Sequence, residues 1–147
     1  MLIEPPKLPE EFFGSAFLAD ELFCDLARDA EDSLRAAKED KQFAAHATIF
    51  DAGEMPRGIY VLTEGDAEIL YNGSQPVHRI RQNEILGLTE AIADLPYKIS
   101  VKTLSPCRFE RIDRDAFLAF LQTQPKVCFR LLQMLGANLR KVYQLFH

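Results

Sequence analysis

Between residues 42 and 112 the sequence consists of short segments in which polar and apolar residues alternate. Alternation with a period of two predicts β-strands that bury one face. The expected strands are 47–50 (ATIF), 59–63 (IYVLT), 67–71 (AEILY), 77–80 (VHRI), 99–104 (ISVKTL) and 108–112 (RFERI). Five of the seven glycines lie between residues 53 and 87, where they separate these segments. Many short strands with glycine corners predict a jelly roll or a related barrel.

The strongest local turn signal in this region is the pair Asn72-Gly73. Both residues tolerate a positive φ angle, which a tight hairpin between two strands requires. We therefore expect the strand 67–71 to turn back on the segment that follows it.

Helical periodicity returns on both sides of the strand region. Before it, apolar residues recur at every fourth position, which predicts a single amphipathic helix within residues 17–40. These residues are Leu18, Leu22, Leu26, Ala30 and Leu34. After it, Asp113 is placed to cap a helix whose apolar face holds Phe117, Leu118 and Leu121. Pro125 suits the first turn of a last helix that continues toward the C-terminus.

The last helix carries apolar residues on two faces. One stripe has the 4, 3, 4, 3, 4 spacing of a heptad seam. It consists of Cys128, Leu132, Leu135, Leu139, Val142 and Phe146. The second stripe, beside it, consists of Val127, Leu131 and Met134. One roll covers only one side of a helix, so two apolar faces favour two partners. We expect a parallel homodimer through residues 126–146; the alternative is a helix wholly buried in its own domain.

The sequence thus predicts a mainly β fold with flanking helices. Its centre is a jelly-roll (double-stranded β-helix) barrel, followed by a long C-terminal dimerisation helix. A chain of 147 residues fits a single domain of this kind.

Composition limits the functions open to such a domain. The net charge is −5, whereas affinity for nucleic acid rests on clustered Lys and Arg. Cys24, Cys107 and Cys128 are far apart and are typical of reduced thiols in a cytoplasmic protein. The N-terminus carries acids and prolines, so we expect neither a signal peptide nor membrane association.

Residues 47–121 resemble the cyclic-nucleotide-binding domain of the Crp–Fnr family of bacterial transcription regulators. The matching stretches are IFDAGEMPRGIYVLTEGDAEI, NEILGLTEAI and PYKISVKTLSPCRFERIDRDAFLAFL. The resemblance implies an eight-stranded roll, a dimerising helix and a ligand pocket between them. Together with the Pro-rich start of the chain, it predicts three parts: an arm (1–15), the roll with its flanking helices (16–122) and the dimerisation helix (123–147). The DNA-binding domain that normally follows in the family is not expected in this chain.

The resemblance also implies a phosphate-binding cassette, in which a glycine opens a short helix whose backbone amides meet the cyclic phosphate. Gly87 matches that glycine. Leu88 stands where a ribose-binding Glu belongs, and Tyr97 stands where a phosphate-binding Arg belongs. Glu90 and Lys98 lie close by, but the first lies on a different side of the short helix and the second on the opposite face of the strand.

We therefore expect a degenerate cassette that binds neither cAMP nor cGMP. Its pocket should be empty, filled by its own side chains, or suited to a less charged and more apolar molecule. The candidate contact residues are Gly87, Leu88, Thr89, Glu90, Tyr97, Lys98 and Ile99.

The function expected from these features is that of a non-enzymatic sensory or regulatory domain of a Crp–Fnr-type transcription regulator. It would act as a homodimer, take no cofactor, respond to a small-molecule effector of unknown identity and bind no DNA itself. A ligand-free interaction and dimerisation module is the main alternative. A cupin-like metal enzyme would need clustered histidines, and His46, His78 and His147 are dispersed. A haem sensor would need an axial ligand, for which His78 or Cys107 are the candidates.

Overall fold

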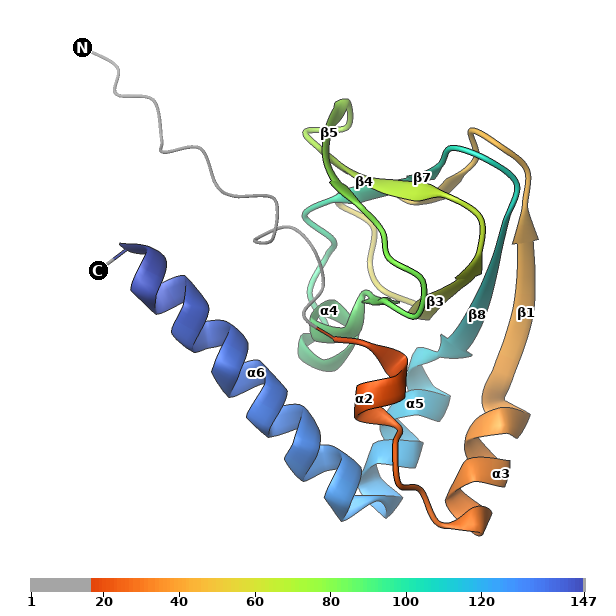
Figure 1. The fold of residues 1–147 in the computed structure, drawn as a ribbon, viewed down its shortest axis with the longest axis vertical. Helices are drawn as coiled ribbons and strands as arrows, with labels where there is room; N and C mark the ends of the chain where they lie inside the picture. The colour runs from red at the N-terminus through yellow and green to blue at the C-terminus, as the bar shows by residue number, and fades with distance from the viewer. Residues whose placement is uncertain (1–16, 147) are drawn as a thin grey trace.

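The computed structural model describes residues 17–146, without the side chains of residues 138, 139, 141–143, 145 and 146. Two four-stranded antiparallel sheets form the body of the molecule (Figure 1). The first has the order β1 (Lys38–Phe43), β8 (Cys107–Asp113), β3 (Gly58–Glu64) and β6 (Ile85–Leu86). The second has the order β2 (Thr48–Phe50), β7 (Ser100–Thr103), β4 (Ala67–Tyr71) and β5 (Gln75–Arg79). The predicted mainly β fold with flanking helices is confirmed.

Within residues 17–146, five helices surround one end and one side of the sheets. They are α2 (Ala19–Leu22), α3 (Arg28–Ala37), α4 (Leu88–Ala93), α5 (Arg114–Thr123) and α6 (Pro125–Phe146). The Asp113 side chain accepts a hydrogen bond from the Asp115 backbone amide, so the predicted cap of α5 is confirmed. As Figure 1 shows, α6 begins beside α5 and runs past α4 and away from the sheets.

The hairpin signal was also correct, because Asn72 and Gly73 connect β4 to β5 with φ angles of 53° and 78°. The prediction of one helix within residues 17–40 was wrong at two places. The helix breaks between α2 and α3, where Asp25 has a left-handed backbone with φ of 67°. It also ends at Ala37, since Lys38–Phe43 pairs with β8 as a strand.

The core has two parts. The first, which we call the helix–sheet core, lies between the helices and the outer face of the first sheet. Its largest fully buried members are Leu22, Ile59, Ile85, Leu88, Ile112, Phe117 and Val127. The second, which we call the roll interior, lies between the two sheets. Its members include Phe50, Leu62, Ile69, Tyr97, Val101 and Phe109. The site residues divide between these two cores.

Candidate ligand pocket at Gly87 and Tyr97

Gly87 joins the short strand β6 to α4 and is the N-cap residue of that helix. Its φ of 81° lies in the left-handed region, which favours glycine. A Cβ atom at this position would lie 3.2 Å from Cε1 and 3.4 Å from the hydroxyl oxygen of Tyr97. The absence of a side chain at Gly87 therefore allows both the left-handed turn and the close approach of the Tyr97 ring.

Tyr97 occupies the roll interior and is only 4% exposed. Its ring stacks on Phe50, with the ring centroids 3.8 Å apart and the planes inclined by 16°. The hydroxyl is 3.5 Å from the carbonyl oxygen of Gly58, to which it donates a weak hydrogen bond. The backbone is fixed as well, since Tyr97 N donates to Glu54 O at 2.9 Å and Gly53 N donates to Tyr97 O at 2.8 Å. The ring is thus held at the position beside Gly87 where the resemblance places a cation.

The electrostatics keep the Tyr97 hydroxyl neutral. Burial raises its pKa far above the ordinary value of 10, and the nearby charges of Glu90 and Glu54 raise that pKa further. The positive charge of Arg111 lowers it, but by less than burial raises it. At physiological pH the side chain is therefore a neutral phenol that can offer a single hydrogen bond.

Arg111 is the cation that sequence reasoning missed near this pocket. It lies on the same face of β8 as Phe109, and its guanidinium carbon is 5.9 Å from the Tyr60 ring centroid. Its charge is already compensated, since its nitrogens lie 3.6 Å from a Glu39 oxygen and 3.5 Å from an Asp113 oxygen. The period-two pattern of the strand 108–112 was the available signal, because it places residue 111 on the inward side with residue 109.

The other candidate residues do not converge on one site. Leu88 is 2% exposed and packs in the helix–sheet core, not in the roll interior with Tyr97 and Ile99. Thr89 is exposed, and its hydroxyl donates to Glu90 at 3.1 Å. Lys98 is exposed as well. The structure therefore brings together Gly87 and Tyr97, and turns the Leu88 side chain to a different part of the core.

The residues of the predicted dimer stripe differ in their exposure to solvent. Leu132 is 64% exposed, and its neighbour Phe129 is 62% exposed. Cys128 and Leu135 pack partly against their own helix–sheet core, and the Cys128 thiol donates to the Leu121 carbonyl at 3.4 Å. The side chains of Leu139, Val142 and Phe146, and the whole arm 1–15, lie outside the described residues. The second stripe faces inward, with Val127 and Leu131 buried.

The histidines and cysteines of residues 17–146 are the candidates for metal or haem ligands. No group of three or more His, Cys, Asp or Glu residues there is placed to hold a metal ion. His78 pairs with the buried Glu84, with His78 Nε2 and Glu84 Oε1 3.1 Å apart. Within the same range, none of the helices has the length and apolar character needed to cross a membrane.

Comparison with known protein families identifies the family to which this fold and sequence belong. The sequence model described as "Cyclic nucleotide-binding domain" matches residues 40–124, which is more than half of the chain. The chain belongs to the cyclic nucleotide-binding domain family. The predicted resemblance is confirmed, and in that family the domain is a regulatory one. A search of curated proteins found no match.

Solved structures share the fold of this cyclic nucleotide-binding domain at low sequence identity. The N-terminal domain of a transcriptional regulator from Streptomyces coelicolor A3(2) is 21% identical, with a TM-score of 0.71; the alignment covers 86% of this chain and 92% of that one. The sensor domain of the transcriptional regulator DNR from Pseudomonas aeruginosa is 22% identical, with a TM-score of 0.72 and coverages of 81% and 87%.

The catabolite activator protein of Thermus thermophilus is a longer relative in structure. It is 18% identical with a TM-score of 0.75, and the alignment covers 86% of this chain but 61% of that protein. This chain therefore spans less than two thirds of the length of that protein.

Proposed function

We propose that this domain is the sensory part of a Crp–Fnr-type transcription regulator, with a cassette that does not bind cyclic nucleotides. The observation that carries the proposal is the position of Tyr97. Its buried ring lies against Gly87 and stacks on Phe50, where the family places the Arg that pairs with the phosphate. The structural similarity to the N-terminal domain of one transcriptional regulator and to the sensor domain of another supports the first half of the proposal.

The physical reason is the loss of the charged partner. A cyclic phosphate that leaves water loses strong hydration and needs a paired cation, usually a bidentate Arg. Each hydrogen bond to a charged group is worth roughly 1.5–3 kcal/mol, and each 1.4 kcal/mol is about a factor of ten in affinity. Tyr97 offers one neutral hydroxyl, and Leu88 lies in the helix–sheet core where it cannot meet a ribose. Affinity should therefore be several powers of ten below that of a complete cassette.

Calorimetric titration directly tests the proposal that the cassette does not bind cyclic nucleotides. We expect no heat of binding for cAMP or cGMP at concentrations up to hundreds of micromolar. A dissociation constant in the low micromolar range for either nucleotide would sink the proposal. It would mean that Lys98, Glu90 or Arg111 supplies the missing charge after a rearrangement of the pocket.

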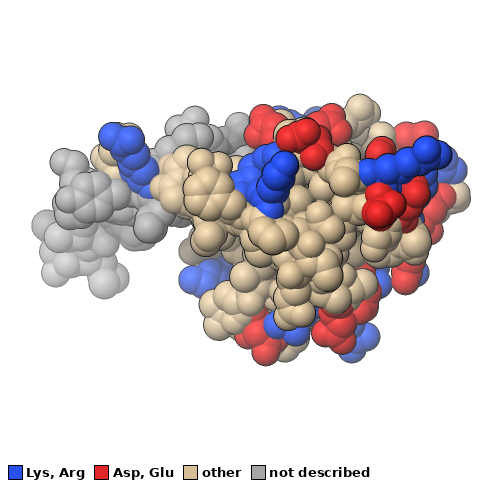
Figure 2. Space-filling model, turned by 90° about the horizontal axis from the view of Figure 1, so that it is seen from below, with Lys and Arg blue, Asp and Glu red and all other residues tan. Residues whose placement is uncertain are grey.

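The same proposal includes a parallel homodimer through α6. Its support is the exposed apolar pair Phe129 and Leu132, on a helix whose opposite stripe is already buried. Figure 2 shows the helical end of the molecule, where uncharged residues fill the centre of the surface and charged residues lie mainly toward its edge. We expect sedimentation at micromolar concentration to give twice the monomer mass of 16.7 kDa. A monomer under those conditions would mean that α6 needs no second copy.

A ligand-free interaction module is the second candidate, and the filled pocket favours it. The stack of Tyr97 on Phe50 leaves the roll interior packed beside Gly87. A thermal-shift screen with small, weakly charged aromatic and aliphatic compounds distinguishes the two. A compound that raises the melting temperature of the parent, and has no effect when Tyr97 is replaced by Trp, favours a sensor. If the screen finds no compound of this kind, the result favours the interaction module.

A further inference from the structure

The orientation of α6 relative to the roll is set by contacts on its first three turns. Val127 and Leu131 are one helical turn apart and are buried in the helix–sheet core. Cys128, Met134 and Leu135, on either side of this stripe, are only partly buried against the same core, so the rotation of α6 about its own axis rests on partial apolar contacts. Beyond Leu135 the exposed residues Gly136, Ala137 and Arg140 mark a part of the helix that projects from the body. A second, polar contact restricts that rotation further.

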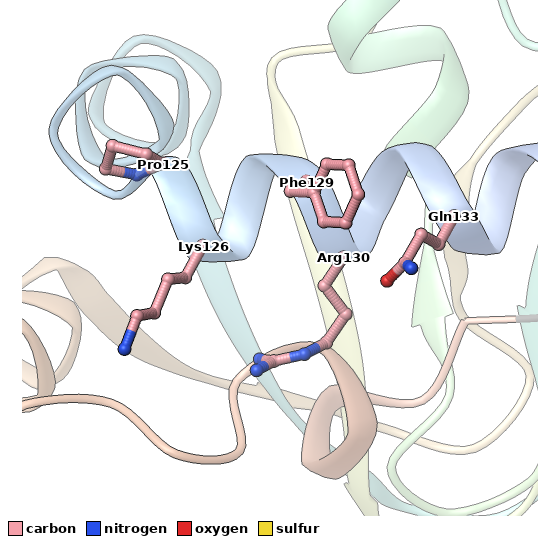
Figure 3. Close-up of a pocket in the computed structure, with 5 residues that line it drawn as sticks. All are labelled: Pro125, Lys126, Phe129, Arg130 and Gln133. Carbon is pink, nitrogen blue, oxygen red and sulfur yellow. The ribbon is translucent and has the colours of Figure 1, made fainter.

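Arg130 makes that second contact, as Figure 3 shows. Its Nη1 atom donates to the carbonyl oxygens of Leu22 at 2.8 Å and Cys24 at 3.0 Å, and its Nη2 lies 4.0 Å from an Asp25 oxygen. Leu22 is the last residue of α2, and the carbonyl groups at the end of a helix carry partial negative charge. The guanidinium therefore fastens α6 to the segment between α2 and α3, which is more than 100 residues away in the sequence.

The other end of α2 is attached to the strand that leads to Gly87. Ala19 N donates to Asn83 O at 2.8 Å, and Ile85 N donates to Phe17 O at 2.9 Å. Leu18 and Glu84 form an antiparallel bridge between these two bonds. The short segment from Phe17 to Cys24 thus connects β6, which ends beside Gly87, to Arg130 on α6.

The same segment has an apolar anchor that does not involve α6. The Phe23 ring packs edge-on against Phe117 and Phe120 of α5, with centroid distances of 6.4 and 6.0 Å. Removal of Arg130 should therefore leave the segment attached to α5, and the protein folded.

We propose that Arg130 is a positioning residue: it fixes the rotation of α6 by binding the carbonyl group of Leu22, at the C-terminus of α2, and that of Cys24 just beyond it, and so couples β6 to α6. The inference concerns contacts within one chain. It needs neither a ligand nor a second copy, so it stands or falls separately from the proposed function. Arginine suits the task because its planar fork donates to several acceptors at once, whereas lysine presents a single point charge.

Residual dipolar couplings of backbone amides test the orientation in the full chain. In the parent, couplings of residues 126–135 and of β3 and β8 should fit one alignment tensor. In Arg130→Ala, the α6 couplings should leave that tensor or shrink, while those of β3 and β8 keep their mutual fit. Arg130→Lys should fall between the two. Lys126→Ala is the matched control, because Lys126 is an exposed base one turn earlier on α6. It should behave as the parent.

Hydrogen exchange gives a second readout on α2. The amides of Leu22 and Phe23, which bond to Leu18 and Ala19, should exchange about tenfold faster in Arg130→Ala than in the parent or Lys126→Ala. Amides of β3 should keep their parental rates. The inference is overturned if Arg130→Ala leaves the α6 couplings on the common tensor. It is equally overturned if Lys126→Ala displaces them to the same extent.

Discussion

Two regions of this molecule carry large aromatic side chains but differ in how far they bury them. Phe109, in the roll interior, is fully buried, and it packs edge-on against Phe43 and Tyr60. Phe129, on the outer face of α6, is 62% exposed beside the equally exposed Leu132. In the roll interior, apolar surface is buried by other side chains of the same chain, whereas the outer face of α6 is left exposed.

This difference indicates where the domain can interact with other molecules. In the proposed function, the stacked rings of Tyr97 and Phe50 occupy the place where a cassette would admit a nucleotide, and they leave the roll little capacity for a charged ligand. A large exposed apolar pair on a helix, by contrast, is typical of a surface that a partner covers. Under these proposals, the roll is mainly a rigid support that sets the direction of α6, with Arg130 as one of the contacts.

The largest effect on the free energy of unfolding should come from removing one buried ring from the roll interior. Phe109→Ala removes a fully buried ring, and such substitutions cost about 3–5 kcal/mol of unfolding free energy. Phe129→Ala, the matched change on α6, should alter the free energy of unfolding by less than about 0.5 kcal/mol when the chain is monomeric. Urea denaturation of both variants at low protein concentration measures the contrast. Similar costs would show that Phe129 is covered within its own chain.

The next effect concerns association rather than folding. Leu132→Asp places a charge in the proposed contact between copies, and the dimer dissociation constant should rise at least about a hundredfold, which is about 2.7 kcal/mol. Sedimentation equilibrium measures it. Gln133→Asp is the control, since it adds the same charge at the next residue of the helix. Equal weakening by both variants would point to net charge, and not to the apolar stripe.

Much of the fold could be predicted from local patterns. Six strands showed alternation, and Asn72-Gly73 marked a hairpin that the structure contains. Strand β1 was missed because its sequence, KEDKQF, has no apolar alternation; it is an exposed edge strand that β8 alone defines. The break at Asp25 was missed because the every-fourth-residue apolar pattern continues straight across it, although α2 and α3 contribute Leu22 and Leu34 to the core from separate helices.

The site was predictable only in part. The resemblance placed Gly87 and Tyr97 together, and the Tyr97 ring does lie beside Gly87, within 3.2 Å of where a Cβ atom would stand. The stack of Tyr97 on Phe50 joins residues 47 positions apart, and the grip of Arg130 on α2 spans more than 100 positions. Periodicity carries no information at such separations. The burial of Leu88 in the helix–sheet core likewise depends on how α4 is turned, which depends on its packing in the folded domain.

A smaller effect should follow when the missing cation is restored. Tyr97→Arg supplies a guanidinium beside Gly87, so cAMP affinity should rise at least about tenfold over that of Tyr97→Leu. The leucine variant is the control, because it removes the ring without adding charge. Calorimetric titration of both variants measures the difference. No difference between them would mean that the backbone around Gly87 has also lost the geometry of a phosphate site.

The smallest effect concerns the Tyr97 proton at high pH. The pKa of the buried hydroxyl is raised well above 10, whereas a tyrosine in the unfolded chain ionises at about pH 10. Above that pH the folded state keeps a proton that the unfolded state releases, so the free energy of unfolding must fall as the pH rises. Tyr97→Phe removes this term. Its stability should fall less steeply than that of the parent between about pH 10 and 11.5, by at most about one proton, or about 1.4 kcal/mol per pH unit.

Urea denaturation at several pH values measures the two slopes, and their difference cancels the titration of other groups. Tyr71→Phe is the matched control, because Tyr71 is 41% exposed and lies on β4, away from the Phe50 stack. It should keep the parental slope. Burial is the largest cause of the raised pKa of Tyr97, ahead of the charges of Glu90 and Glu54. If Tyr97→Phe and the parent lose stability at the same rate, water reaches the hydroxyl, and the roll is open beside Gly87 instead of filled.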